Sequence, residues 1–177
     1  MRIVAGTAKG RRLLAPRGKG TRPTSDRVRE AVFDILGSLE PPYDDIVEGA
    51  DVADLFAGTG AMGLEALSRG AASATFVERD REAADVIERN LAATGLGPGH
   101  VVRADVMTWL RAAPAYDIAF CDPPYGFAAW PELLAAVSGR LVVAESDTGV
   151  ADSSGRPLIR SRRYGSTVVD LLGEPPS

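Results

Sequence analysis

Three glycines with the spacing G-x-G-x-x-G follow directly on a short apolar run, and this arrangement constrains the fold more than any other feature. The run covers residues 51–56, and the glycines are Gly58, Gly60 and Gly63. Glycine allows close approach of the backbone to a ligand and the tight turn that opens a helix, expected here over residues 61–69. The pattern predicts a strand, a loop and a helix that bind a nucleotide-like cofactor. On its own it fits nicotinamide cofactors equally well.

The rest of the chain alternates between strand-like and helical segments. We expect strands at residues 74–77, 100–104, 118–121 and 141–145, and helices at residues 81–94, 105–111 and 130–137. Such alternation is typical of an α/β protein with a parallel, doubly wound sheet. A closing hairpin is expected from residues 157–163 and 166–171.

The tetrapeptide Asp122-Pro123-Pro124-Tyr125 follows the apolar run 118–121, where a buried strand would end. Open α/β sheets bind their ligands at these strand ends. The Asp122 carboxylate and a backbone carbonyl can accept the two hydrogens of an amine, the prolines stiffen the turn, and Tyr125 offers a stacking face. The motif predicts an amine-binding catalytic turn. The alternative is a proline turn with Tyr125 packed locally.

Three carboxylates stand at or near the ends of other expected strands. Glu78 comes about 20 residues after Gly58, where a carboxylate can accept both ribose hydroxyls of a nucleoside. Asp54 would repel a pyrophosphate but suits the cationic amino-acid end of S-adenosylmethionine, and Asp105 can receive an adenine amino group. Each alone could be a helix N-cap or a surface group. Together they favour a sulfonium nucleoside over a dinucleotide.

Positive charge is concentrated at the N-terminus. Residues 1–30 carry a charge of +7 in a chain whose net charge is −4. Their cations are Arg2, Lys9, Arg11, Arg12, Arg17, Lys19, Arg22, Arg27 and Arg29. The acidic net charge argues against a protein that binds polyanions non-specifically. The local basic patch is nevertheless typical of a surface that binds a phosphate backbone. A hairpin of residues 2–5 and 11–15 would present Lys9, Arg11 and Arg12 outward.

A second basic cluster near the C-terminus consists of Arg156, Arg160, Arg162 and Arg163. It predicts either another phosphate-binding surface or solvated side chains without a partner.

An amphipathic helix is expected shortly after the N-terminal basic segment. Its apolar residues are Val28, Ala31, Val32, Ile35, Leu36 and Leu39, and Ser25 or Asp26 would cap it. Pro41-Pro42 suggests a boundary between an extension, residues 1–40, and a catalytic unit, residues 41–177. The apolar face should pack on the sheet, which argues against independent folding of the extension.

Composition excludes several other classes of protein. A chain of 177 residues with 45% hydrophobic content suffices for one compact enzyme. We expect neither a membrane span nor a secretory signal, since no apolar stretch is long enough. Cys121 cannot form an internal disulfide and reads as a buried filler in a cytoplasmic protein, and a single histidine, His100, gives little basis for a metal site.

Long stretches of the chain resemble the RsmD family of class I S-adenosylmethionine-dependent methyltransferases. The resemblance lies in residues 2–13, 21–30 and 32–36, in Asp54 to Gly60, in Asp122 to Tyr125, and in Arg163-Tyr164-Gly165. It implies a Rossmann-like fold with a seven-stranded, mostly parallel sheet, an antiparallel edge strand, and an N-terminal hairpin and helix. The segment between Tyr125 and Glu145 is shorter than the family pattern.

The same resemblance implies methylation of the exocyclic N2 of a guanine in 16S ribosomal RNA, within the small subunit or an assembly intermediate. The catalytic residues would be Asp122, Pro123, Pro124 and Tyr125. The cofactor-binding residues would be Arg22, Thr24, Asp54, Phe56, Gly58, Gly60, Glu78 and Asp105, with Arg22 and Thr24 closing over S-adenosylmethionine. The RNA-binding residues would be Lys9, Arg11, Arg12, Arg17 and Lys19. No metal is implied.

Other functions stay open at the level of sequence. Related amine-binding motifs serve DNA adenine-N6 and protein glutamine-N5 methyltransferases, and the tetrapeptide does not separate these substrates. The N-terminal resemblance and the lack of a visible target-recognition domain favour RNA. A non-catalytic RNA-binding assembly factor or a nicotinamide oxidoreductase would be functions of another class.

Overall fold

The computed structural model describes residues 1–16 and 26–175. The helices are α1 (Asp26–Leu36), α2 (Ala61–Ser68), α3 (Arg81–Thr94), α4 (Val106–Trp109) and α5 (Trp130–Ala136). The strands are β1 (Asp51–Leu55), β2 (Ser73–Val77), β3 (Gly99–Val102), β4 (Tyr116–Cys121), β5 (Gly139–Ser146), β6 (Leu158–Tyr164) and β7 (Thr167–Leu172). Single 3₁₀ turns cover Leu110–Ala112 and Ala151–Ser153.

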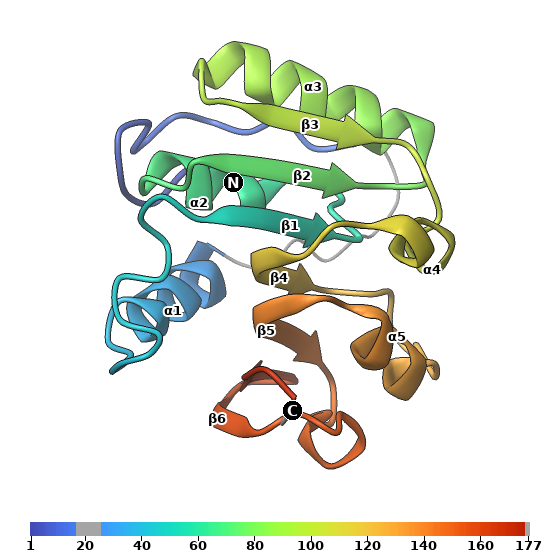
Figure 1. The fold of residues 1–177 in the computed structure, drawn as a ribbon. Coiled ribbons are helices and arrows are strands. Elements are labelled where there is room, and N and C mark those ends of the chain that lie inside the picture. The colour runs from blue at the N-terminus through green and yellow to red at the C-terminus, as the bar shows by residue number, and fades with distance from the viewer. Residues whose placement is uncertain (17–25, 176–177) are drawn as a thin grey trace.

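The strands form one seven-stranded sheet in the order β3-β2-β1-β4-β5-β7-β6. The first five strands in this order are parallel, so their carboxyl ends, marked by the arrowheads, lie at the same end of the sheet (Figure 1). β7 runs antiparallel to both β5 and β6, and β6 forms the edge. The predicted α/β class and Rossmann-like sheet are confirmed.

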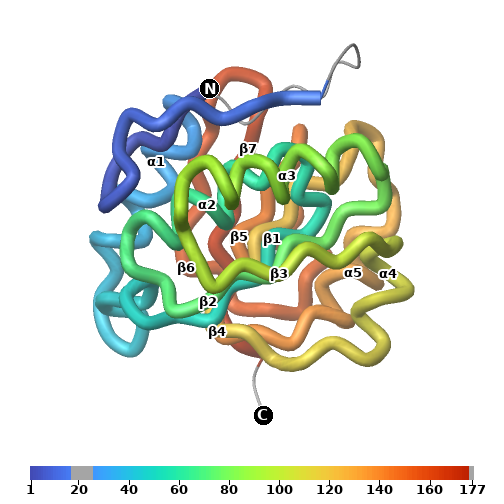
Figure 2. Tube along the Cα trace, turned by 90° about the horizontal axis from the view of Figure 1, so that it is seen from above, coloured from blue at the N-terminus to red at the C-terminus, as the bar shows by residue number. Residues whose placement is uncertain are grey.

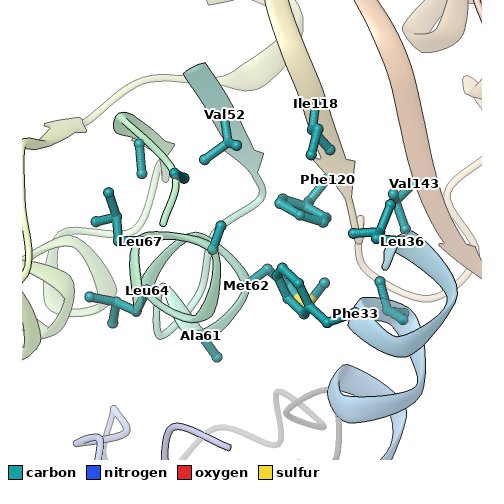
Figure 3. Close-up of a cluster of buried hydrophobic side chains, with 14 of the residues drawn as sticks. Phe33, Leu36, Val52, Ala61, Met62, Leu64, Leu67, Ile118, Phe120 and Val143 are labelled. Atoms are coloured by element: carbon teal, nitrogen blue, oxygen red, sulfur yellow. The ribbon is translucent and has the colours of Figure 1, made fainter. Parts of the chain in front are cut away.

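Two hydrophobic layers cover the faces of this sheet. One contains α1, α2, α3 and the N-terminal segment, and Figure 3 shows Phe33 and Leu36 of α1 beside Met62 of α2 and Phe120 of β4. The Phe33 and Phe120 ring centroids lie 5.7 Å apart. The other layer contains α4 and α5. Successive residues of β1 alternate between the layers, since Val52 belongs to the first and Ala53 to the second.

The N-terminal segment forms a minimal hairpin that is tied to the helices of the first layer. Arg2 and Arg12 form an antiparallel bridge, and Gly10 N donates to Ile3 O at 2.8 Å. Leu14 N donates to Asn90 Oδ1 on α3 at 2.8 Å. In Figure 2 the blue segment accordingly runs beside α3. Ile3, Ala8 and Leu13 share one core with the sheet, so the proposed boundary at residue 41 separates no hydrophobic core.

Two arginines counted as surface cations are buried. Arg29 is fully buried and donates to Glu65 and Asp26. Arg156 is 8% exposed and donates to the carbonyls of Leu134, Val137, Gly139 and Gly173. Burial lowers the pKa of Arg156. Both side chains hold elements of the fold together by hydrogen bonds. The N-terminal basic patch and the C-terminal basic cluster therefore each expose one cation fewer than the sequence suggested.

Within the described residues, no helix has the length and apolar character needed to cross a membrane.

Candidate functional site

The carboxyl ends of four parallel strands lie in register at one edge of the sheet. Leu55 of β1 pairs with both Val77 of β2 and Cys121 of β4, and Val77 pairs with Val102 of β3. The residues that follow these ends include Phe56, Glu78 and Asp122. Tertiary structure therefore brings the predicted cofactor loop and the predicted amine-binding turn to neighbouring strand ends.

The three glycines of the loop have different physical roles. Gly58 and Gly60 have φ angles of 55° and 76°, in the left-handed region that favours glycine. Among the described residues, a Cβ added at Gly58 would meet only Phe56 O, at 3.9 Å, so these residues leave one side of the loop open to a ligand. A Cβ at Gly63 would clash with the Phe76 ring. Gly63 therefore serves the close packing of α2 on β2.

Glu78 joins the end of β2 to the glycine loop. Its Oε2 accepts from Gly58 N at 2.9 Å, and its Oε1 accepts from Asp80 N at 2.8 Å. These two bonds fix the carboxylate beside the open side of the loop. Because each carboxylate oxygen has a second lone pair, Glu78 can still accept from a ligand hydroxyl.

Asp54 lies in the interior, directly beneath the start of α2. It is 4% exposed, and its Oδ2 accepts from Gly63 N at 2.9 Å. Burial raises the pKa of Asp54 to about 7, the Gly63 hydrogen bond opposes this shift, and the charge of Glu78 adds to it. A carboxyl group that ionises near neutrality at a ligand loop is typical of a functional site.

Asp105 is the N-cap of a helix. This structural role is the one that the sequence left open as the alternative to cofactor binding. Its Oδ1 accepts from Thr108 N at 2.9 Å at the start of α4. The side chain is exposed at the same sheet edge, one strand beyond Glu78. An N-cap and an adenine contact are compatible, because the carboxylate has two oxygens.

The Asp122 turn presents an aromatic ring to solvent. Tyr125 is 64% exposed, Pro123 is buried, and Phe127 N donates to Pro124 O at 3.1 Å. Cys121, just before the turn, is buried, and burial raises the pKa of its thiol to about 12. A thiol with this pKa stays protonated at neutral pH, so Cys121 is a packing residue rather than a nucleophile.

The predicted RNA-binding residues fall into two groups. Lys9, Arg11 and Arg12 are exposed on the hairpin, and Arg11 Nη1 also donates to Ala93 O at 3.0 Å. The others, Arg17 and Lys19, lie outside the described residues, as do the predicted cofactor residues Arg22 and Thr24.

Sequence reasoning missed several buried polar groups that hold the site. Asn90, 1% exposed, donates from Nδ2 to Thr59 O in the glycine loop and to Leu14 O. Glu65, fully buried, accepts from Val4 N and Ala5 N at 2.8 and 2.9 Å. The available signal was a single charge in the otherwise apolar run of α2. In the part of the chain that the structure describes, no group of three or more metal-binding side chains occurs.

The family model and the sequence relatives that match this chain point to the same family. Residues 1–172 match the model of the family described as conserved hypothetical protein 95. Ribosomal RNA small subunit methyltransferase D of Escherichia coli K12 is 41% identical over 126 residues, which cover 71% of this chain but only 60% of that protein. YlbH of Bacillus subtilis is 38% identical over 97% of this chain and 90% of its own length.

A solved structure supports the same relationship. A hypothetical protein of Thermus thermophilus is 34% identical and superposes with a TM-score of 0.81 over 98% of this chain and 99% of that one. Since the family model spans nearly the whole chain, the chain belongs to the conserved hypothetical protein 95 family, the RsmD family of methyltransferases.

Proposed function

We propose that this protein transfers a methyl group from S-adenosylmethionine to ribosomal RNA, and that the acceptor is the exocyclic N2 of a guanine in 16S RNA. Its substrate would be the small subunit or an assembly intermediate in the cytoplasm. The carrying observation is the register of the parallel strands, which brings the glycine loop, bonded to Glu78, to the strand end next to the Asp122 turn. Family membership and the name of the Escherichia coli relative support the ribosomal RNA substrate.

The loop geometry fits S-adenosylmethionine. The open side of Gly58 allows close approach of a ligand, and Glu78 is held where it can accept ribose hydroxyls. Asp54 contacts the start of α2 through Gly63 N and suits a cationic amino-acid end. Bound there, S-adenosylmethionine supplies an electrophilic methyl group on a sulfonium.

The protein's own residues would orient the acceptor. Asp122 holds the guanine amine by accepting one of its hydrogens, so that the nitrogen lone pair points toward the methyl group. The same carboxylate would take the proton that the amine releases as the N–CH3 bond forms and the S–CH3 bond breaks, the sulfur leaving as a neutral thioether. Tyr125, with its exposed ring, stacks on the extruded base, a contact worth roughly 1–3 kcal/mol. Alignment of the two reactants can supply about 7–11 kcal/mol of the barrier.

The direct test is methyl transfer from radiolabelled S-adenosylmethionine into small ribosomal subunits from cells that lack this protein. Nucleoside digestion and chromatography identify the product, and N2-methylguanosine is expected. A different methylated nucleoside would redirect the assignment to another acceptor atom. Cofactor binding without any transfer would favour a non-catalytic RNA-binding factor.

Affinity for S-adenosylmethionine should rise with pH up to neutrality. Burial raises the pKa of Asp54 to about 7, so below that pH the folded protein holds a proton that a bound cation must displace. The affinity should therefore fall toward tenfold per pH unit below 7 and level off above it. Calorimetric titration between about pH 5.5 and 7.5 measures this before free α-amino groups lose their protons.

Two variants separate Asp54 from other groups in this pH profile. Asp54→Asn should bind weakly with no slope. Glu78→Gln should bind more weakly above neutrality and keep the slope, but the slope should begin at a lower pH because the charge of Glu78 contributes to the raised pKa of Asp54. A full slope in Asp54→Asn would assign the titration to another group.

Charge reversal on the hairpin should weaken RNA binding. Lys9 and Arg12 are exposed, so Lys9→Glu with Arg12→Glu removes two phosphate contacts without breaking the core. RNA affinity should fall about tenfold or more and the salt dependence should become shallower, while cofactor affinity stays unchanged. Filter binding at several salt concentrations measures both effects. The control, Arg111→Glu with Arg140→Glu, makes the same change in net charge elsewhere on the surface. An equal loss of RNA affinity in this control would show that net charge, rather than the hairpin, causes the effect.

A further inference from the structure

The glycine loop and the amine-binding turn leave the sheet at neighbouring strand ends. The β1–β4 ladder ends at the pair Leu55 and Cys121. Beyond it, Phe56 leads into the glycine loop and Asp122 leads into the amine-binding turn. In the described part of the chain, the ladder between these two strands goes no further, so side-chain contacts help to set the separation of the two loops.

Phe127 supplies such a connection. Its ring centroid lies 5.5 Å from that of Phe56, with an interplanar angle of 66°, and 5.6 Å from that of Trp130, at 88°. Both are edge-to-face arrangements of the kind that aromatic pairs prefer. Phe127 thus links the first residue after β1 to the first residue of α5.

The backbone at both ends of this contact is specialised. Phe56 has a φ of 60°, which residues other than glycine rarely adopt, so packing must hold it there. On the other side, the hydrogen bond from Phe127 N to Pro124 O closes the turn that carries Tyr125. Gly126, inside this turn, has a φ of 75°. Movement of the Phe127 ring would therefore move the amine-binding turn relative to the glycine loop.

We infer that Phe127 is a positioning residue that fixes the distance between the cofactor loop and the amine-binding turn. The inference rests on the proposed methyl transfer, in which two reactants held by different loops must meet in line. A misplacement of about 1 Å can cost about 100-fold in rate. The half-buried side chain of Phe127 touches the loops rather than the reacting atoms, so its loss should affect turnover more than binding.

Two substitutions at this position separate ring geometry from apolar volume. Phe127→Leu keeps an apolar side chain but removes the edge-to-face contacts, and kcat should fall about 10- to 100-fold. The Kd for S-adenosylmethionine and the thermal midpoint should stay close to wild type. Phe127→Tyr keeps the ring and should restore kcat to near the wild-type value.

A matched control lies on β4, at the end of the strand away from the Asp122 turn. Tyr116 of β4 packs on Trp109 with centroids 6.0 Å apart, so Tyr116→Leu removes an aromatic pair remote from the site. Its kcat should equal that of wild type. Wild-type kcat in Phe127→Leu, or an equal fall in Tyr116→Leu, would overturn the positioning role while leaving the proposed function intact. A wild-type protein that transfers no methyl group would overturn the function, and this inference with it.

Discussion

Replacing Asp122 by alanine should nearly abolish methyl transfer while the protein still folds and binds S-adenosylmethionine. Asp122 follows β4 at the same end of the sheet as the glycine loop, but the described residues expected to bind the cofactor lie at the β1, β2 and β3 ends. Loss of its carboxylate removes both the orientation of the amine and the acceptor of its proton. Proton transfer by a positioned group contributes about 10²–10⁴-fold, and we expect a loss of this size in kcat.

Single-turnover transfer into small subunits, with calorimetric titration of the cofactor, measures the two effects separately. Asp117→Ala is the matched control, because Asp117 lies on the same strand at the amino end and pairs with Arg140 at 3.5 Å. That partly exposed pair is worth at most about 1 kcal/mol, and the hydrogen bond that Asp117 Oδ2 accepts from Asp51 N is also exposed, so the control should remain active. Comparable turnover by Asp122→Ala would remove Asp122 from the mechanism. Asp122→Asn should retain part of the orientation but not the proton acceptor.

Local patterns predicted the secondary structure well because the signals are local. A helix was predicted at residues 81–94, and α3 covers this range; the structure adds its N-cap, Asp80, whose Oδ1 accepts from Ala83 N. Strand ends were predicted to within a few residues for the same reason. Site residues such as Glu78 and Asp122 could be predicted because they directly follow strands that the sequence itself indicates.

The order of the last two strands depends on burial rather than on turns. A hairpin signal gives two paired strands without saying which one joins the sheet. β7 carries the apolar run Val168-Val169 and Leu171-Leu172, all buried, whereas β6 carries three arginines. Apolar content therefore favours β7 beside β5, and charged side chains protect β6 as an edge strand.

Buried charges could not be predicted because their partners are distant in sequence. Arg29 meets Glu65, 36 residues away, and Arg156 meets carbonyls 17–22 residues away. From sequence alone, an arginine in a basic segment is expected to be solvated. The link between Phe56 and Phe127 has the same origin, since it follows from the pairing of β1 with β4.

Glu65 should be the most costly residue to remove for stability. Its side chain is fully buried and accepts from Arg29 Nε at 3.3 Å, Arg69 Nε at 2.9 Å, and the backbone amides of Val4 and Ala5. Glu65→Ala removes the buried counter-ion of Arg29 Nε, so that, among the described residues, the buried guanidinium keeps only Asp26 and Arg2 O as acceptors, and it leaves two part-buried amides without their acceptor. Breaking a buried ion pair costs about 3–5 kcal/mol, a large share of the roughly 5–15 kcal/mol that stabilises a domain.

Urea unfolding followed by circular dichroism measures this loss, and the melting temperature should fall by roughly 6–20 °C. Arg140→Ala, which breaks the exposed pair with Asp117, is the control and should cost less than about 1 kcal/mol. Glu65→Leu combined with Arg29→Met should recover only part of the loss. The reason is that an apolar pair removes the stranded charge but leaves Val4 N and Ala5 N without an acceptor. Because those amides hold the hairpin to α2, the double variant should also lose hydrogen-exchange protection at Val4 and Ala5, and with it RNA affinity. Full recovery of both stability and protection would show that Glu65 acts only as the counter-ion of Arg29.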